Sequence, residues 1–298
     1  MKRDGTETRA VIVTRLWGGQ GNQMFQYALG RRLALDRGAR LKLDLGAFAG
    51  DPLRTYTLHH LRIQADIAKP EEVQAFRPPL ARVFERFGPL RRCLTPRFII
   101  EQGFPYDARV LRAPRSAYLA RGYWQTEKYF APVAHTIRAD FQLLRPMTPS
   151  RMALREQLID CASVSVHVRR GDYVANAVTN AYHGTCAPEW YAQAMAVIAT
   201  KVPGARFFVF SDDPQWARAN LPTDWPIAFV DPSDDGRDYE DMHLMAACRH
   251  HITANSSFSW WGAWLNPSPA KIVIAPRQWF REARNDTRDL VPESWLRL

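Results

Sequence analysis

The sequence predicts an α/β protein made of two Rossmann-like halves, each with a parallel sheet covered by helices. Short apolar runs alternate with amphipathic stretches of helical spacing, and polar or glycine-rich clusters directly follow the predicted strands. A length of 298 residues allows two domains. Hydrophobic residues make up 46% and charged residues 23% of the chain, which excludes a disordered protein, collagen and a coiled coil.

The N-terminal half begins with a strand, a glycine loop and a helix. The apolar run at 11–16 leads into the glycine loop at 18–21, and helical spacing follows over 22–37. A second strand is expected at 41–44. This order of elements is typical of a Rossmann-like unit.

The middle of the chain is less regular. Residues 66–115 are expected to be helical and rich in loops, because prolines interrupt them repeatedly. A strand is expected at 117–124. Prolines just before residue 150 mark a boundary, so the predicted domains are 1–150 and 151–298.

The second half restarts the alternation of strands and helices, which predicts a parallel sheet covered on both faces. Ligands of such sheets bind beyond the carboxyl ends of the strands. The expected strands are 163–168, 205–210, 227–230, 251–253 and 271–275, and the expected helices are 188–200, 214–219, 239–249 and one that begins at Ser257.

Positive charge is concentrated in the N-terminal half. Residues 1–150 hold 25 Lys and Arg against 13 Asp and Glu, whereas residues 151–298 hold 15 against 17. Ten arginines lie between Arg77 and Arg121. They fit a surface that attracts an anionic membrane or a phosphorylated substrate, or equally the solvated faces of amphipathic helices. Nucleic acid is the weaker alternative, because no nucleic-acid-binding motif occurs.

The cysteines and the N-terminus exclude other classes. The four cysteines have no C-x-x-C spacing, which indicates free thiols in a reducing compartment rather than disulfides or a zinc site. No signal peptide or bilayer-spanning stretch is recognisable. We expect a cytoplasmic protein, or one at the inner face of a membrane.

Three polar clusters follow predicted strands. The glycine loop with Asn22 and Gln23 is typical of a tight turn or of a ligand-binding loop. In the second cluster, 167–173, adjacent arginines suit phosphate, although an Arg170–Asp172 ion pair would also explain them. In the third, 254–261, small hydroxyl residues at a helix start fit a phosphate site or an ordinary N-cap.

Other residues of these regions have simpler explanations. Trp260, Trp261 and Trp264 are expected to pack in the core. Asp212 and Asp213 could bind a metal, but no D-x-D motif occurs, and Asp212 fits a helix cap equally well. No metal site is therefore expected.

Four segments carry most of these clusters, in this order along the chain: GGQGNQMFQYALGRRLA (18–34), GYWQTEKYF (122–130), SVHVRRGDYV (165–174) and DMHLMAACRHHITANSSFSWWGAWLN (241–266). Taken together, they closely resemble the bacterial α-1,2-fucosyltransferases, glycosyltransferase family 11. The resemblance implies a GT-B type fold of two Rossmann-like domains facing a cleft, with the donor held mainly by the C-terminal one. It also implies the donor GDP-β-L-fucose, inversion at the fucose anomeric carbon and no essential metal or other cofactor.

The resemblance assigns the donor phosphates to two of the clusters. Arg169 matches the arginine that contacts the diphosphate in the wider fucosyltransferase superfamily. Arg170 matches a second basic residue that is present in some branches. Ser256, Ser257 and Phe258 match the turn that wraps the phosphates.

The remaining assignments concern the guanine, the sugar and the proton. His167 and Asp241 match positions that approach the guanine, and Asn22 matches an asparagine near the fucose and the acceptor. The general base stays open: Asp172 and His183 are candidates by position, and the departing phosphate is a third.

The resemblance thus implies transfer of L-fucose to the 2-hydroxyl of a terminal β-galactoside in surface glycan synthesis, with an acceptor that could be lipid-linked. The alternative on the same scaffold is a non-catalytic protein that binds a nucleotide sugar or a glycan.

Overall fold

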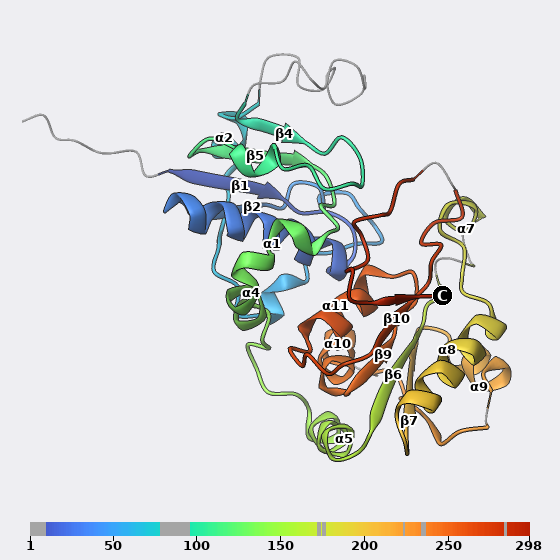
Figure 1. Cartoon of the computed structure of the whole chain (residues 1–298). Coiled ribbons are helices and arrows are strands. Elements are labelled where there is room, and N and C mark those ends of the chain that lie inside the picture. The colour runs from blue at the N-terminus through green and yellow to red at the C-terminus, as the bar shows by residue number, and fades with distance from the viewer. Residues whose placement is uncertain are drawn as a thin grey trace, which may run out of the picture. The chain divides into compact units, whose positions relative to one another are not determined.

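Two parallel sheets organise the chain in the computed structural model, which describes residues 10–77, 96–171, 174, 177–222, 224–233, 237–282 and 285–298 (Figure 1). The chain divides into two compact units, residues 1–144 and residues 145–298, named here the N-terminal and C-terminal units. This division falls before helix α5 (Pro149–Asp160), which the expected boundary at residue 150 would cut.

The N-terminal unit has a five-stranded sheet in the order β3-β2-β1-β5-β4, and every pair in it is parallel. Its strands are β1 (Val11–Arg15), β2 (Arg40–Asp44), β3 (Asp66–Ile67), β4 (Phe98–Ile100) and β5 (Ala117–Arg121). Its α-helices are α1 (Gln20–Arg37), α2 (Pro70–Gln74) and α4 (Ala134–Asp140), and its 3-10 helices are η1 (Leu58–His60), η3 (Val110–Arg112), η4 (Glu127–Tyr129) and η5 (Ala131–Val133).

Helix α1 packs very closely on β1, which confirms the expected strand, glycine loop and helix. A Cβ at Gly30 would lie 2.1 Å from Oγ1 of Thr14, so only glycine permits this approach. The helix ends at Gly38, whose left-handed φ of 58° closes the last turn. The close approach at Gly30 thereby holds the carboxyl-terminal part of β1 against the middle of α1.

The C-terminal unit has a six-stranded parallel sheet in the order β11-β10-β9-β6-β7-β8. Figure 1 shows α8 and α9 on one side of this sheet and α10 and α11 on the other. The strands are β6 (Ser163–Val168), β7 (Arg206–Ser211), β8 (Ile227–Phe229), β9 (His250–Ile252), β10 (Val273–Ala275) and β11 (Leu296–Arg297). Besides α5, the helices are α7 (Ala177–His183), α8 (Pro188–Lys201), α9 (Pro214–Asn220), α10 (Asp238–Ala247) and α11 (Ser257–Leu265).

The core of the C-terminal unit lies against β6. Valines of this strand pack with β7 and α8, and all six of its residues are buried. Trp260, Trp261 and Trp264 are buried as expected. Because β6 is covered on both faces, its side chains reach a ligand only from its carboxyl end.

The expectation of helices and loops over 66–115 is incomplete, and the expected extent of one strand is wrong. The region 66–115 contains the strands β3 and β4, which are too short to show an alternating pattern. The strand expected at 117–124 ends at Arg121, because the chain turns at Gly122 and Trp124 adopts a φ of 58°. None of the described helices combines the length and the apolar character that crossing a bilayer requires.

Candidate active site

The loop after β6 places two arginines at the carboxyl edge of the sheet. In the sheet, β6 lies between β7 and β9. Its carboxyl end is therefore next to the loop after β7, which carries Asp212, and to the loop after β9, which leads into α11. Ligands of parallel α/β sheets bind at this edge.

The carboxylate of Asp212 holds the two arginines in place. Its Oδ2 lies 3.0 Å from Nη1 of Arg169, and its Oδ1 accepts a 2.8 Å hydrogen bond from the backbone N–H of Arg170. A Cβ at Gly171 would lie 2.6 Å from Oδ2 of Asp212, so glycine is needed for this approach. Asp212 therefore orients the arginines and is not a helix cap.

Arg170 is bound to α9. Its Nε lies 3.3 Å from Oδ2 of Asp213, and its guanidinium lies 3.9 Å from the centre of the Trp216 ring. Asp213 is also the N-cap of α9 and accepts a 3.1 Å hydrogen bond from the N–H of Trp216. The observed ion pair is thus Arg170–Asp213, whereas Asp172 lies outside the described residues.

His167, the penultimate residue of β6, is buried and neutral. Burial and the charge of Arg169 lower its pKa to about 3, so it is too weak a base to take a proton from a sugar hydroxyl at neutral pH. Its Nδ1 has no hydrogen-bond partner among the described residues. Its ring lies 5.8 Å from that of Phe258, which places both side chains at the same edge.

The start of α11 supplies the third part of the site. Ser256 is its N-cap, and its Oγ accepts a 3.3 Å hydrogen bond from the N–H of Phe258. Ser257 and Phe258, the first two residues of the helix, are half-buried. The free N–H groups and the dipole at a helix N-terminus favour an anion.

Asp241 makes its contacts elsewhere. Its carboxylate lies 3.1 Å from the guanidinium of Arg151 on α5, and burial raises its pKa to about 6 although Arg151 opposes this shift. Among the described residues, no hydrogen bond or ion pair joins Asp241 to His167.

His183 ends α7 and packs against aromatic rings. Its ring lies 4.8 Å from that of Tyr182 and 5.4 Å from that of Phe280. Asn255, just before α11, donates hydrogen bonds of 2.9 Å to the carbonyl of His183 and 3.2 Å to that of Trp279. Asn255 thereby ties α7 to the loop after β9, a role that its place in the third cluster did not reveal.

Asn22 lies in the N-terminal unit at the start of α1. Its Oδ1 accepts a 2.7 Å hydrogen bond from Nε2 of Gln125. Gly18 has a φ of 77°, and a Cβ there would lie 2.9 Å from Nδ2 of Asn22. The glycine loop and the turn after β5 therefore fix the Asn22 amide from two sides.

The turn after β5 is held by Glu101, which the sequence did not single out. Its two carboxylate oxygens accept hydrogen bonds of 2.8 and 2.9 Å from the N–H groups of Tyr123 and Trp124. Burial raises the pKa of Glu101 to about 7, although these bonds oppose the shift. The Tyr123 ring stacks on Trp17 at 4.1 Å, so the turn is joined to the glycine loop.

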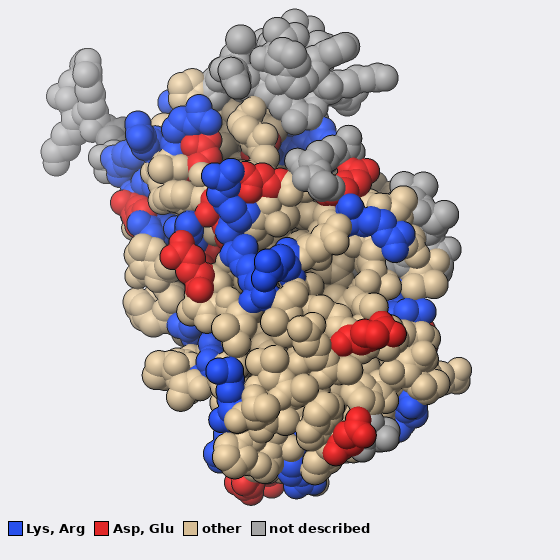
Figure 2. Space-filling model, turned by 45° about the vertical axis from the view of Figure 1, so that its right-hand side comes forward, with Lys and Arg blue, Asp and Glu red and all other residues tan. Residues whose placement is uncertain are grey.

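The arginines from Arg77 to Arg121 are only partly described. Arg82, Arg86, Arg91 and Arg92 lie outside the described residues. Five of the others are exposed: Arg97, Arg109, Arg112, Arg115 and Arg121. Figure 2 shows acidic side chains among the Lys and Arg side chains of the visible face. In the parts of the chain that the structure describes, no three His, Cys, Asp or Glu side chains group as metal ligands.

Comparisons with known proteins agree on one family. The family model for Glycosyl transferase family 11 matches residues 105–298. An alpha-1,2-colitosyltransferase of Escherichia coli is 35% identical over 97% of this chain and 99% of its own length. The O-antigen biosynthesis glycosyltransferase WbnK of Escherichia coli is 30% identical over 95% of this chain and 99% of its own length. A galactoside alpha-(1,2)-fucosyltransferase 2 of Bos taurus is 32% identical over 34% of this chain and 30% of its own length.

A solved structure supports the fold. An Arabidopsis thaliana FUT1 variant in complex with GDP superposes with a TM-score of 0.55 at 12% identity, over 99% of this chain and 77% of that chain. With its two Rossmann-like units and parallel sheets, the protein has a fold of the GT-B type. The chain belongs to glycosyl transferase family 11.

Proposed function

We propose that the protein transfers L-fucose from GDP-β-L-fucose to the 2-hydroxyl of a terminal β-galactoside, with inversion, in the synthesis of a bacterial surface glycan. The 1,2 linkage and the galactoside are named for the relatives from Escherichia coli and Bos taurus. The acceptor is lipid-linked in this proposal, which brings the exposed arginines of the N-terminal unit near an anionic membrane.

The pairing of Arg169 with Asp212 carries the proposal. When the glycosidic bond of the donor breaks, negative charge develops on the GDP diphosphate. A preoriented guanidinium beside a helix N-terminus stabilises such charge without a metal ion. Arg169 and the start of α11 therefore face the diphosphate, and neutral His167 contributes a ring nitrogen as a hydrogen-bonding group.

The acceptor hydroxyl must lose a proton during the transfer. The candidates for the base are Asp172, His183 and the departing phosphate itself. His167 is not among them, because a pKa of about 3 makes it too weak a base at neutral pH. On the acceptor side, Asn22 is a polar group whose amide is held by Gln125 at the start of α1, and we assign it to the sugar.

Colitosyl transfer is the second candidate. It is favoured by the 35% identity to the colitosyltransferase over 97% of the chain. Colitose lacks the 3-hydroxyl of L-fucose, so a site that hydrogen-bonds this hydroxyl would reject it. Competition between equal concentrations of GDP-fucose and GDP-colitose separates the two candidates.

The test is an acceptor panel with GDP-fucose in EDTA, read by GDP release and by NMR of the product. We expect an α-1,2-linked fucose on terminal galactose, formed at the same rate with and without the chelator. Activity that is lost in EDTA and restored by Mn²⁺ or Mg²⁺ would contradict metal independence. Binding of GDP-sugars without GDP release for any acceptor would favour the non-catalytic alternative.

A further inference from the structure

A cavity in the N-terminal unit has no role in the site described above. It has a volume of about 320 Å³ and lies beyond the carboxyl end of β4, between the segment 101–110 and the turn after β5. This volume is at the small end of the range of roughly 300–1,000 Å³ for ligand sites, so it suits one small ring. Its lining includes Glu101, Tyr106, Asp107, Arg109 and Trp124.

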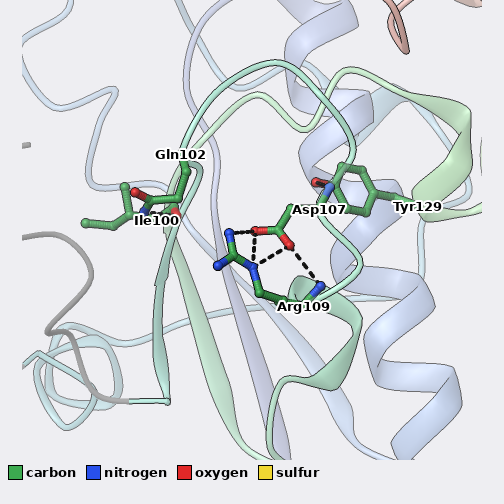
Figure 3. Close-up of polar contacts among 5 residues, drawn as sticks. All are labelled: Ile100, Gln102, Asp107, Arg109 and Tyr129. Atoms are coloured by element: carbon green, nitrogen blue, oxygen red, sulfur yellow. Dashed lines mark hydrogen bonds and ion pairs between the residues drawn. The ribbon is translucent and has the colours of Figure 1, made fainter.

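The charges of the cavity exclude an anionic ligand. Asp107 and Arg109 form a fork-like ion pair, with nitrogen to oxygen distances of 2.8 Å for both Nε–Oδ1 and Nη2–Oδ2 (Figure 3). Among the described residues that line the cavity, Arg109 is the one arginine and is neutralised by its neighbour, while Glu101, with its pKa raised to about 7, adds a second acidic group. A phosphate or sulfate would meet more negative than positive charge here.

The same groups suit a neutral polyhydroxylated ring. Tyr106 lines the cavity and is half-buried, so its ring is accessible to a ligand. It packs on the buried ring of Tyr129 at 5.0 Å, and Tyr129 packs on the buried ring of Trp124 at 6.0 Å. Aromatic rings pack on the C–H face of a sugar, while carboxylate, guanidinium and amide groups bond its hydroxyls. Gln102 brings such an amide to the lining, where its Nε2 donates a 2.9 Å hydrogen bond to the carbonyl of Ile100 (Figure 3).

The wall of the cavity is continuous with the acceptor-side glycine loop. Trp124 lines the cavity, and the residues on either side of it contact the loop: Tyr123 stacks on Trp17, and Gln125 bonds Asn22. Glu101 binds the backbone of this turn while it lines the cavity. A ligand in the cavity therefore lies against the same turn that fixes Asn22.

We propose that this cavity binds the sugar next to the fucosylated galactose, the penultimate residue of the acceptor glycan. The inference rests on the proposed function, because it assumes a glycan acceptor at the glycine loop. It makes the loop 101–110 a determinant of acceptor specificity, and it predicts that the enzyme prefers a disaccharide to a simple galactoside.

The experiment compares lactose and N-acetyllactosamine with methyl β-galactoside. For the wild type we expect kcat/KM at least tenfold higher for one of the disaccharides. Arg109→Ala and Gln102→Ala remove exposed side chains at the rim and should reduce that ratio at least threefold each. Arg112→Ala is the matched control, an exposed arginine outside the cavity, and should leave the ratio as in the wild type.

A binding measurement without donor keeps this test separate from the proposed function. Saturation-transfer NMR should show contacts from both rings of the preferred disaccharide, and contacts to the second ring should weaken in Arg109→Ala. A wild-type ratio near one, or a ratio unchanged by both rim variants, overturns the inference even if fucose is transferred. The absence of transfer to any galactoside overturns the proposed function instead. In that case the NMR contacts alone test whether the cavity binds the second sugar ring.

Discussion

The carboxylate of Asp212 lies 3.0 Å from the guanidinium of Arg169 and accepts a hydrogen bond from the backbone N–H of Arg170. The two residues are 43 positions apart and meet because β6 and β7 are neighbours in the sheet. The pair fixes the direction of an arginine that would otherwise have several rotamers. Its geometry is set before any donor arrives, as electrostatic stabilisation of a leaving group requires.

Asp212→Asn tests this preorganisation. The amide oxygen can still accept from the Arg170 N–H, but the ion pair is lost, so we expect the Kd for GDP to rise about tenfold. Titration calorimetry measures it. Asp231→Asn is the control, because its partner Arg218 forms an exposed pair in the same unit, and it should change Kd little. Tighter GDP binding in Asp212→Asn would show that the carboxylate competes with the diphosphate.

His167 predicts a pH dependence of stability. Its pKa is about 3 in the folded protein and near 6.5 when unfolded, so the unfolded chain binds the proton first as pH falls. Its contribution to the free energy of unfolding is full above pH 6.5. It decreases by about 1.4 kcal/mol per pH unit between 6.5 and 3.

Denaturant titrations of the wild type and His167→Asn at several pH values check this. The difference between them cancels other titrating groups, such as Glu101, whose raised pKa acts in the opposite direction. From pH 7 to pH 5 the wild type should lose about 2 kcal/mol relative to the variant. A difference that is constant with pH would mean that His167 is not buried as a neutral group.

Gly122→Ala tests the turn that holds Asn22. A Cβ at this position would lie 2.5 Å from the Trp124 ring and 2.6 Å from Cβ of Glu101, so the turn must move. We expect a loss of about 1–3 kcal/mol in the stability of the N-terminal unit, with lower activity. At Gly19 the nearest atom, Nη1 of Arg54, would be 3.8 Å away, so Gly19→Ala should be tolerated. Equal effects of the two variants on the thermal midpoint would contradict this account.

The exposed arginines of the N-terminal unit predict salt-dependent membrane binding. Arg112→Gln together with Arg115→Gln removes two charges, and binding to vesicles of anionic lipid should fall about tenfold or more at physiological salt. Sedimentation of the vesicles measures it, and the effect should disappear at high salt. If the double variant bound these vesicles as tightly as the wild type, the exposed arginines would form only a solvated surface.

Sequence patterns predicted those elements of the fold whose signal lies within a single segment of the chain. The strand 163–168 and the start of α11 at Ser257 lie where they were expected, because an apolar run and an N-cap residue mark them. Helix α5 was missed, since it buries only Arg151 and Leu158 and so has no apolar stripe. Its Pro149 is the first residue of the helix rather than part of a linker.

The residues of the site also divide into those that local sequence patterns predict and those that they do not. Arg169 and Ser256 stand in motifs that can be read along the chain. The partners that position the site come from other strands: Asp212 follows β7, while Glu101 precedes its bonded N–H groups by 22 and 23 residues. Nothing near Glu101 in the sequence distinguishes it from a surface acid, because its burial follows from the order of β4 and β5 in the sheet.

The most direct test of the central claim is the rate of fucose transfer by Arg169→Ala and Arg169→Lys. We predict turnover about 10²–10³-fold below the wild type for alanine, the loss expected when a donor to a developing negative charge is removed. Lysine should restore little, because a point charge lacks the fork that Asp212 orients. The exposed Arg218→Ala serves as the control and should retain wild-type turnover. Turnover near that of the wild type in Arg169→Ala would contradict the assignment of this site to the donor diphosphate.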